Sequence, residues 1–281
     1  MQPYSNSGSP DASRPEDRLP GDVTYLRTMI VNVVMIGAPG SGEWVLVDTG
    51  MPGSSSKIVK AARERFGTDK PKAILLTHGH FDHTGSVKDL MELFPDVPVY
   101  AHELELPFLT GRADYPPGDP TVGGGLMAAS APLFPNKGID LGGRAQPLPA
   151  DGSVPYLPDW HWLHTPGHSE GHVSFFRNLD GTLVAGDAFI TVKQESALAV
   201  LTQRREIHGP PTYFTPNWEA ARTSVARLVA LRPAAAVTGH GEPMAGDELV
   251  QGLEHLSSHF DEVAVPASGR YVDSARIKPE P

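Results

Sequence analysis

A short apolar segment that leads directly into a histidine-rich loop is the feature that most constrains the fold of this chain. Residues 73–76 are apolar, and they are followed by Thr77-His78-Gly79-His80-Phe81-Asp82-His83-Thr84-Gly85. Imidazole nitrogens and carboxylate oxygens are ligands of zinc and related transition metals. Alternate residues of an extended segment point to the same side, so the first two histidines can bind one ion together. Asp82 and His83 lie past the turn and can face a second ion. The pattern predicts a buried strand that ends in a metal-binding loop, and it disfavours a plain polar loop.

Three further apolar segments end in a glycine beside a histidine or an aspartate. They are Trp162-Leu163-His164-Thr165-Pro166-Gly167-His168, Leu183-Val184-Ala185-Gly186-Asp187 and Ala236-Val237-Thr238-Gly239-His240-Gly241. Glycine lets the backbone turn tightly as it leaves a strand, and loops at strand ends commonly carry functional groups. Alone, each polar residue would be interpreted as a turn or cap residue. Together with the loop at 78–83, His168, Asp187 and His240 give seven candidate ligands, which is enough for two metal ions.

Composition narrows the classes of partner. The formal charge of −10 over 281 residues argues against nucleic acid, because binding to phosphate depends on lysine and arginine. The chain has no cysteine, which excludes disulfides, thiolate ligands and a thiol nucleophile. No apolar run is long enough to span a bilayer. We therefore expect a cytoplasmic protein that acts on a small molecule without a membrane or nucleic-acid partner. Assembly into a homo-oligomer is left open.

The chain divides into a leader, one large domain and a tail. Residues 1–22 are rich in serine, proline and aspartate and predict a flexible leader. Residues 23–265 predict a single domain, and 266–281 a tail. Within the domain, 104–157 is crowded with proline and glycine and is interpreted as an insertion. The insertion also contains apolar residues that could form a lid over the metals or an oligomer contact, namely Phe108, Tyr115, Leu126, Met127 and Phe134.

Alternating hydrophobicity and turn signals predict the regular elements. Strands are expected over residues 23–36, 43–47, 73–76, 97–101, 160–164, 173–177, 182–185 and 234–238. Helices are expected over residues 54–66, 87–94, 218–231 and 247–260. Each half of the chain thus has strands and then helices, which is typical of two packed sheets flanked by helices.

The ordered set of ligand candidates resembles the metallo-β-lactamase superfamily of dinuclear hydrolases. The matching residues are His78-x-His80-x-Asp82-His83, His168, Asp187 and His240, and Asp48 in Val47-Asp48-Thr49-Gly50 matches another motif of that superfamily. The resemblance extends over roughly residues 23–260. It implies an α/β (α+β) fold, an αββα four-layer sandwich of two mixed β-sheets flanked by helices. The metals would lie at one edge, between loops of both halves.

The resemblance also implies roles for the candidate ligands. The first ion would be held by His78, His80 and His168, the second by Asp82, His83 and His240, and both by Asp187. A carboxylate has two oxygens and can bridge two ions, which an imidazole does not normally do. The expected cofactor is two Zn²⁺ per chain, although the same nitrogen and oxygen ligands also accept manganese, iron or cobalt.

Four other residues receive two interpretations each. Asp48 is either a turn residue or an acceptor that orients a ligand histidine. His172 matches a position that is often histidine in the superfamily, and we expect a structural or supporting role. His208 and Tyr213 follow Asp187 in the sequence and could line the substrate pocket, but ordinary loop packing is an alternative.

The function implied by the resemblance is hydrolysis of an ester, thioester or lactone by a metal-bridging hydroxide. Asp82 would orient that nucleophile and transfer a proton. The bridging position of Asp187 and the absence of cysteine favour the glyoxalase II-type thioesterases and the lactonases over true β-lactamases. The alternatives are an iron-dependent oxidoreductase of the same superfamily, a phosphodiesterase and a non-enzymatic metal-binding scaffold. The sequence does not specify the substrate or the native metal.

Overall fold

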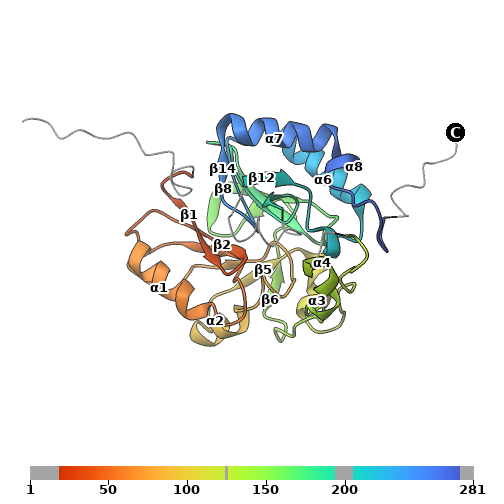
Figure 1. The fold of residues 1–281 in the computed structure, drawn as a ribbon. Helices are drawn as coiled ribbons and strands as arrows, with labels where there is room; N and C mark the ends of the chain where they lie inside the picture. The colour runs from red at the N-terminus through yellow and green to blue at the C-terminus, as the bar shows by residue number, and fades with distance from the viewer. Residues whose placement is uncertain (1–18, 124–125, 194–204, 273–281) are drawn as a thin grey trace, which may run out of the picture.

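The computed structural model describes residues 19–123, 126–193 and 205–272. In this part of the chain, two six-stranded sheets pack face to face and helices cover the outer face of each sheet (Figure 1). The predicted αββα sandwich is therefore confirmed. Most of the predicted leader and tail, residues 1–18 and 273–281, falls outside the described residues. Among those described, no helix is both long enough and apolar enough to cross a membrane.

The first sheet has the strand order β1-β2-β3-β4-β5-β6. Its strands are β1 (Val23–Thr28), β2 (Val31–Ile36), β3 (Val45–Val47), β4 (Ile74–Leu75), β5 (Val99–Ala101) and β6 (Ala145–Pro147). The first three strands are antiparallel, and β3 to β6 run parallel. The single strand expected over 23–36 is in fact the hairpin of β1 and β2. The chain turns at Met29, which has a φ of 62°. No Gly, Asn or Asp marks this turn in the sequence, so the usual signal was missing.

The second sheet has the order β14-β13-β10-β9-β8-β7. Its strands are β7 (Ser153–Val154), β8 (Leu157–His164), β9 (Val173–Arg177), β10 (Thr182–Gly186), β13 (Ala235–Thr238) and β14 (Met244–Ala245). Strands β10 and β13 are parallel and the other neighbours are antiparallel. A separate antiparallel ribbon is formed by β11 (Ile190–Val192) and β12 (Arg205–His208).

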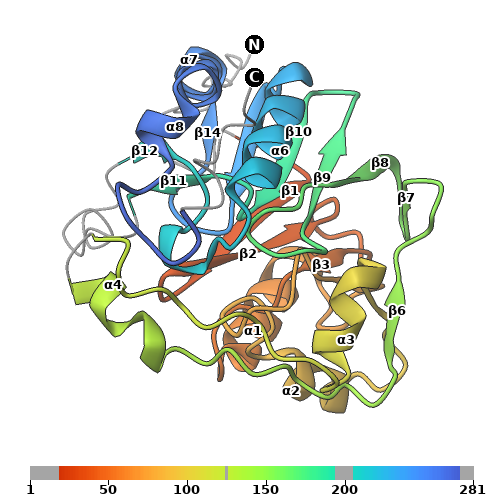
Figure 2. The same ribbon diagram turned by 90° about the vertical axis from the view of Figure 1, so that its right-hand side faces the viewer.

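The longer helices lie on the outer faces of the two sheets (Figures 1 and 2). The first sheet is covered by α1 (Ser55–Phe66) and α2 (Val87–Leu93), and the second by α6 (Trp218–Ala230) and α7 (Gly246–Ser258). The shorter helices are α3 (Leu106–Leu109), α4 (Leu126–Ser130) and α8 (Phe260–Val263), with 3₁₀ turns η2 (Glu103–Glu105), η3 (Ala131–Leu133) and η4 (Thr212–Phe214). The helix expected over 247–260 ends at Ser258, and α8 follows it after His259.

Strand β2 shows why the sheets are covered on both sides. All six of its residues are buried. Val33 and Met35 pack in the core that includes α1, whereas Val34 and Ile36 pack in the core between the sheets. Successive residues of a strand point to opposite faces, so a strand that is buried throughout needs a cover on each face.

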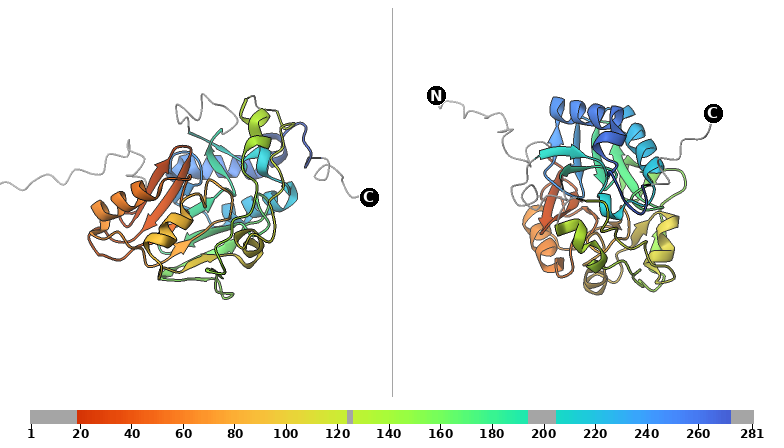
Figure 3. Two further views of the ribbon diagram at one scale, coloured as in Figure 1. Left: turned by 90° about the horizontal axis from the view of Figure 1, so that it is seen from below. Right: turned by 45° about the vertical axis from the view of Figure 1, so that its right-hand side comes forward.

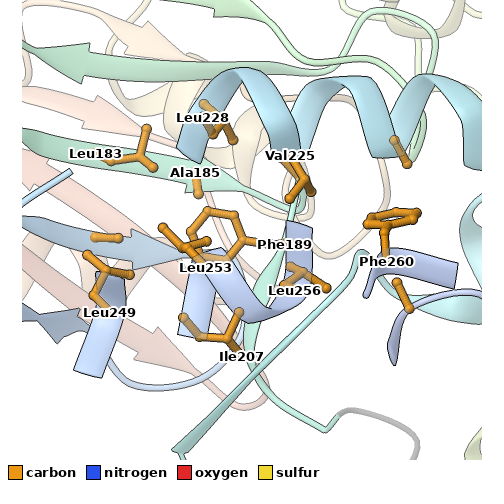
Figure 4. Packing of buried hydrophobic residues seen from close by; sticks show 14 of the residues in the cluster. Leu183, Ala185, Phe189, Ile207, Val225, Leu228, Leu249, Leu253, Leu256 and Phe260 are labelled. Atoms are coloured by element: carbon orange, nitrogen blue, oxygen red, sulfur yellow. The ribbon is translucent and has the colours of Figure 1, made fainter. Parts of the chain in front are cut away.

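The core outside the second sheet has the same construction. Leu183 and Ala185 of β10 pack against helix residues that include Leu228 of α6 and Leu253 of α7 (Figure 4). Val184, between them in sequence, packs in the core between the sheets instead. The two cores fix the position of β10 and therefore of the loop that follows it.

Segment 104–157 contributes to both sheets. It supplies β6 at the edge of the first sheet and β7 at the edge of the second. Its helices α3 and α4 lie along the side of the sandwich (Figure 3). Phe108 stacks on Tyr115 with ring centroids 4.1 Å apart. The side chains of Leu126 and Met127 lie outside the described part of the structure.

Candidate metal centre

Strand register brings the candidate ligands of the second half to one edge. Gly186 of β10 is paired with Thr238 of the parallel strand β13, so Asp187 and His240 both emerge at the same edge of the sheet. The loop that carries His168 connects β8 to β9 at that edge as well. Carboxyl ends of parallel strands meeting at one edge are a common place for functional loops.

Hydrogen bonds between the two sheets bring the histidine loop to the same place. The Val173 N–H at the start of β9 donates to the carbonyl of Thr77, 2.9 Å away and two residues after the first-sheet strand β4. The buried amide of Asn32 donates to the carbonyls of Thr238 and Gly241, at 2.9 and 2.6 Å. These bonds join the strand ends from both halves, so the loops between them are held against each other.

Three imidazoles form the first cluster. His78 Nε2 lies 3.0 Å from His80 Nδ1, which lies 2.9 Å from His168 Nε2. All three side chains are buried. Burial lowers the pKa of each imidazole, to about 3 for His80. The rings are therefore neutral at physiological pH, which is the form that binds a metal ion.

Hydroxyl groups determine which nitrogen of two of these rings carries the proton. The Thr77 hydroxyl donates to Asp48 at 2.8 Å, so it accepts from His78 Nδ1 at 3.1 Å. The Thr215 hydroxyl donates to a backbone carbonyl and accepts from His168 Nδ1 at 3.3 Å. Both rings then direct an unprotonated Nε2 into the cluster. Lone pairs that converge in this way are suited to a shared cation.

The second cluster contains Asp82, His83 and His240, and Asp187 lies at its border. His240 Nε2 lies 3.2 Å from Asp187 Oδ2 and 3.5 Å from Asp82 Oδ2. His83 Nε2 lies 3.5 Å from the same Asp187 oxygen. Burial lowers the pKa of His83, but the charges of Asp187, Asp48 and Asp82 outweigh it and hold the pKa well above its usual value. This cluster therefore attracts positive charge.

Asp187 lies between the two clusters. Its Oδ2 is 3.4 Å from His168 Nε2 of the first cluster, in addition to its contacts with the second. Burial raises the pKa of Asp187, but His240 and His83 hold it well below its usual value. The neighbouring Gly239 allows this approach, because a Cβ there would be 1.9 Å from Asp187 Oδ1. A carboxylate in this position is suited to bridging two cations.

The two histidines of the second cluster also form hydrogen bonds through their Nδ1 atoms, which point away from the cluster. His83 Nδ1 donates to Asp48 Oδ2 at 2.8 Å, and His240 Nδ1 donates to the Ile30 carbonyl at 2.8 Å. Asp48 also accepts from the Thr77 backbone N–H at 2.8 Å. Such contacts fix the orientation of metal-binding imidazoles. Asp48 therefore has the geometry of an orienting group.

His172 faces the backbone behind Asp187. Its Nε2 accepts from the Asp187 N–H at 2.8 Å, and its Nδ1 pairs with the Thr165 hydroxyl at 2.9 Å. Burial lowers its pKa to about 3, so the ring stays neutral. The geometry is that of a residue that positions the Asp187 loop.

These residues fit two divalent cations. Ligand-type atoms lie within 4.8 Å of one another in three overlapping groups: His78, His80 and His168; His78, His83 and Asp187; and Asp82, His83 and His240. Among the described residues, the buried His83 Nε2 and Asp187 Oδ1 have no hydrogen-bond partner. Buried polar atoms without partners are costly. A cation at each cluster would satisfy them.

Glu105 is a component of the site that sequence reasoning missed. This fully buried carboxylate accepts from the Gly79 N–H at 2.9 Å and the Gly171 N–H at 3.0 Å. It also accepts from the hydroxyls of Ser169, at 2.6 Å, and Tyr115. Burial raises the pKa of Glu105, while these four donors favour the carboxylate. The bonds tie the His78–His80 loop to the loop after His168. The only sequence signal is an acidic residue between two leucines.

The two tentatively assigned pocket residues lie in different cavities. Tyr213 is buried and lines a cavity that also contacts His80, Asp82 and His168. His208 lines a neighbouring cavity that has no residue in common with the first. The structure thus places Tyr213, but not His208, beside the clusters.

Comparison with known proteins identifies the family. A family model described as the metallo-beta-lactamase superfamily matches residues 26–240. The chain belongs to this superfamily. The predicted resemblance is thereby confirmed, and the fold and the two-cluster site described above are those of a superfamily member.

Several superfamily members share more than the fold with this chain. The Bacillus subtilis protein named "Probable metallo-hydrolase YflN" is 48% identical over 240 residues, covering 85% of this chain and 90% of that protein. A hydroxyacylglutathione hydrolase of Cronobacter sakazakii is 42% identical, but over 72 residues that cover 26% of this chain and 27% of that enzyme. The crystal structure of TTHA1623 in a di-iron-bound form has a TM-score of 0.54 and 28% identity, covering 83% of this chain and 96% of that one. Two of these relatives are thus hydrolases by name, and the solved structure of the third is a di-iron-bound form.

Proposed function

We propose that this superfamily member is a dinuclear metal-dependent hydrolase that cleaves an ester, thioester or lactone. The observation that carries the proposal is the position of Asp187, whose Oδ2 lies 3.2–3.5 Å from histidines of both clusters. A purely structural metal site is closed by its protein ligands, whereas these clusters border a cavity. The hydrolase names of the relatives support the same class of reaction.

The seven candidate ligands would bind the two cations. His78, His80 and His168 would hold one cation, Asp82, His83 and His240 the other, and Asp187 both. When bound, two such cations supply the positive charge that lowers the pKa of a water molecule and polarises a carbonyl.

Asp82 is the group on this chain best placed to handle a proton. It lines the cavity, and its Oδ2 is 3.5 Å from His240 Nε2. We assign to it the orientation of the attacking water and the acceptance of its proton, which then passes to the leaving group. Asp48 and His172 act indirectly, by holding His83 and the Asp187 loop in place.

An iron-dependent oxidoreductase is the second candidate. The observation in its favour is the di-iron form of TTHA1623, which is 28% identical to this chain. Nitrogen and oxygen ligands accept zinc and iron alike, so the ligand set does not separate the two functions.

A substrate panel separates the two candidates. Metal-free protein would be reconstituted with Zn²⁺ or Fe²⁺ and assayed with aryl esters, acyl thioesters, lactones, phosphodiesters and β-lactams. We expect hydrolysis of the first three classes by zinc-loaded protein and its loss on chelation. Absence of hydrolysis with either metal, together with oxygen consumption by the iron form, would refute the hydrolase proposal.

A further inference from the structure

We propose that the substrate presents an apolar and uncharged acyl group to this site, and that Phe134 is the main residue that selects it. The inference rests on the proposed hydrolase function and narrows its substrate class. It follows from the lining of the cavity beside the two clusters.

Apart from the ligand-type residues, the cavity wall is apolar and aromatic. The ligand-type residues are His80, Asp82, His168, Asp187 and His240. The others are Ile30, Phe81, Phe134, Pro211, Tyr213 and Phe214. We call these six the apolar wall. They come from the β1–β2 turn, the histidine loop, segment 104–157 and the stretch around η4, so the wall is assembled from four separate parts of the chain.

Phe134 holds the apolar wall together. Its ring stacks on Phe81 with centroids 5.9 Å apart and an angle of 18° between the planes. It also lies 6.1 Å from the rings of Tyr213 and Phe214. Ala128, Ala131 and Tyr213 form the small buried core against which Phe134 packs. Phe134 therefore joins the histidine loop to the stretch around η4, and it is a fixed part of the wall.

Among the described residues, the cavity wall offers a large anionic acyl carrier no cationic partner. Among the described residues that line the cavity, there is no lysine or arginine. Lys193 lines the neighbouring cavity, which contains no residue of the apolar wall. Glutathione and coenzyme A carry carboxylates or phosphates, which proteins bind with cationic side chains. The short match to hydroxyacylglutathione hydrolase, 26% of this chain, therefore does not extend to a site for the glutathione moiety in the described wall.

Two matched aryl esters test this inference directly. The 4-nitrophenyl esters of butyric acid and of succinic acid have four-carbon acyl chains and differ in one terminal carboxylate. With zinc-loaded full-length protein, we expect kcat/KM for the succinate ester to be at least about 100-fold lower, because its carboxylate would be desolvated without a partner. From acetate to butyrate, kcat/KM is expected to rise about fourfold per methylene, the value of one buried CH₂ group.

A variant pair assigns the selectivity to Phe134. Phe134→Ala is expected to raise KM for the butyrate ester and to flatten the dependence on chain length, with kcat little changed, because the lost contacts are made in the ground state and the transition state alike. The matched control is Leu133→Ala, since Leu133 is exposed and absent from the cavity wall. It should leave both parameters unchanged.

Different outcomes would contradict this inference and the proposed hydrolase function. Equal or faster hydrolysis of the succinate ester or of lactoylglutathione by wild-type protein would overturn the inference and leave the hydrolase proposal intact. Failure to hydrolyse any ester or thioester would overturn both. If kcat/KM of folded Phe134→Ala protein depended on acyl chain length as in the wild type, Phe134 would not be the residue that selects the acyl group. The wild-type ester pair decides the substrate class even if that variant does not fold.

Discussion

Replacement of Asp187 by alanine is expected to lower kcat/KM for ester hydrolysis by about 10³-fold or more. Loss of a residue that only supports a metal ligand already costs about 10–100-fold in metal affinity or activity. Asp187 should cost more, because its carboxylate lies against histidines of both clusters. The variant should also retain at most one of two metal equivalents. The measurements are steady-state kinetics and elemental analysis of the purified protein.

An exposed aspartate provides the matched control for this change. Asp261 lies in α8, and its partner is Arg222 on the surface. Asp261→Ala should keep full metal content and full activity, since surface ion pairs contribute little. Circular dichroism would show that both variants are folded. Full metal content and unchanged turnover in Asp187→Ala would contradict the assigned role of Asp187.

Glu105→Gln is expected to weaken binding of the first metal ion by about 10–100-fold. Each carboxylate oxygen of Glu105 accepts from two donors. Glutamine has the same size, but its NH₂ group cannot accept a hydrogen bond. It would replace one of the two oxygens and face two donors, so the hydrogen bonds either to Gly79 and Tyr115 or to Ser169 and Gly171 would be lost. The loops would then hold His78, His80 and His168 less accurately. The measurement is a competition titration of metal-free protein against a chromophoric chelator.

The control for Glu105 lies two residues away. Glu103 is exposed on the same 3₁₀ turn, and Glu103→Gln should leave metal affinity unchanged. Tyr115→Phe removes one of the four donors and should give an intermediate effect. The absorption spectrum of the Co²⁺-substituted protein reports ligand geometry directly. A lower unfolding temperature with unaltered spectrum and affinity would assign Glu105 to stability alone.

Sequence patterns predicted the parts of the molecule that depend on local order. The αββα layers follow from strands such as β2, whose apolar residues face both sides of the sheet, and from amphipathic helices such as α1. The seven candidate ligands were found because each stands at the end of a short apolar strand, next to a glycine in most cases. The resemblance to the superfamily implied that Asp187 and His240 lie together, and in the structure the parallel pairing of β10 with β13 brings them to one edge.

The parts that were missed depend on contacts between residues distant in sequence. Glu105 bonds to Gly171, 66 residues away, and no pattern near Glu105 indicates this partner. Phe134 was noted only as one of several apolar residues in segment 104–157. Its contact with Phe81 appears only in the folded chain. The hairpin at Met29 was missed for a different reason, because its turn lacks the residues that usually mark one.

The central claim is that two metal ions act together in ester hydrolysis. It is tested most directly by titrating metal-free protein with Zn²⁺ while measuring hydrolysis of 4-nitrophenyl butyrate. Activity should rise and reach a plateau with a break at two equivalents per chain, in keeping with the two ligand clusters joined by Asp187. A plateau at one equivalent, or no hydrolysis at any ratio, would contradict it.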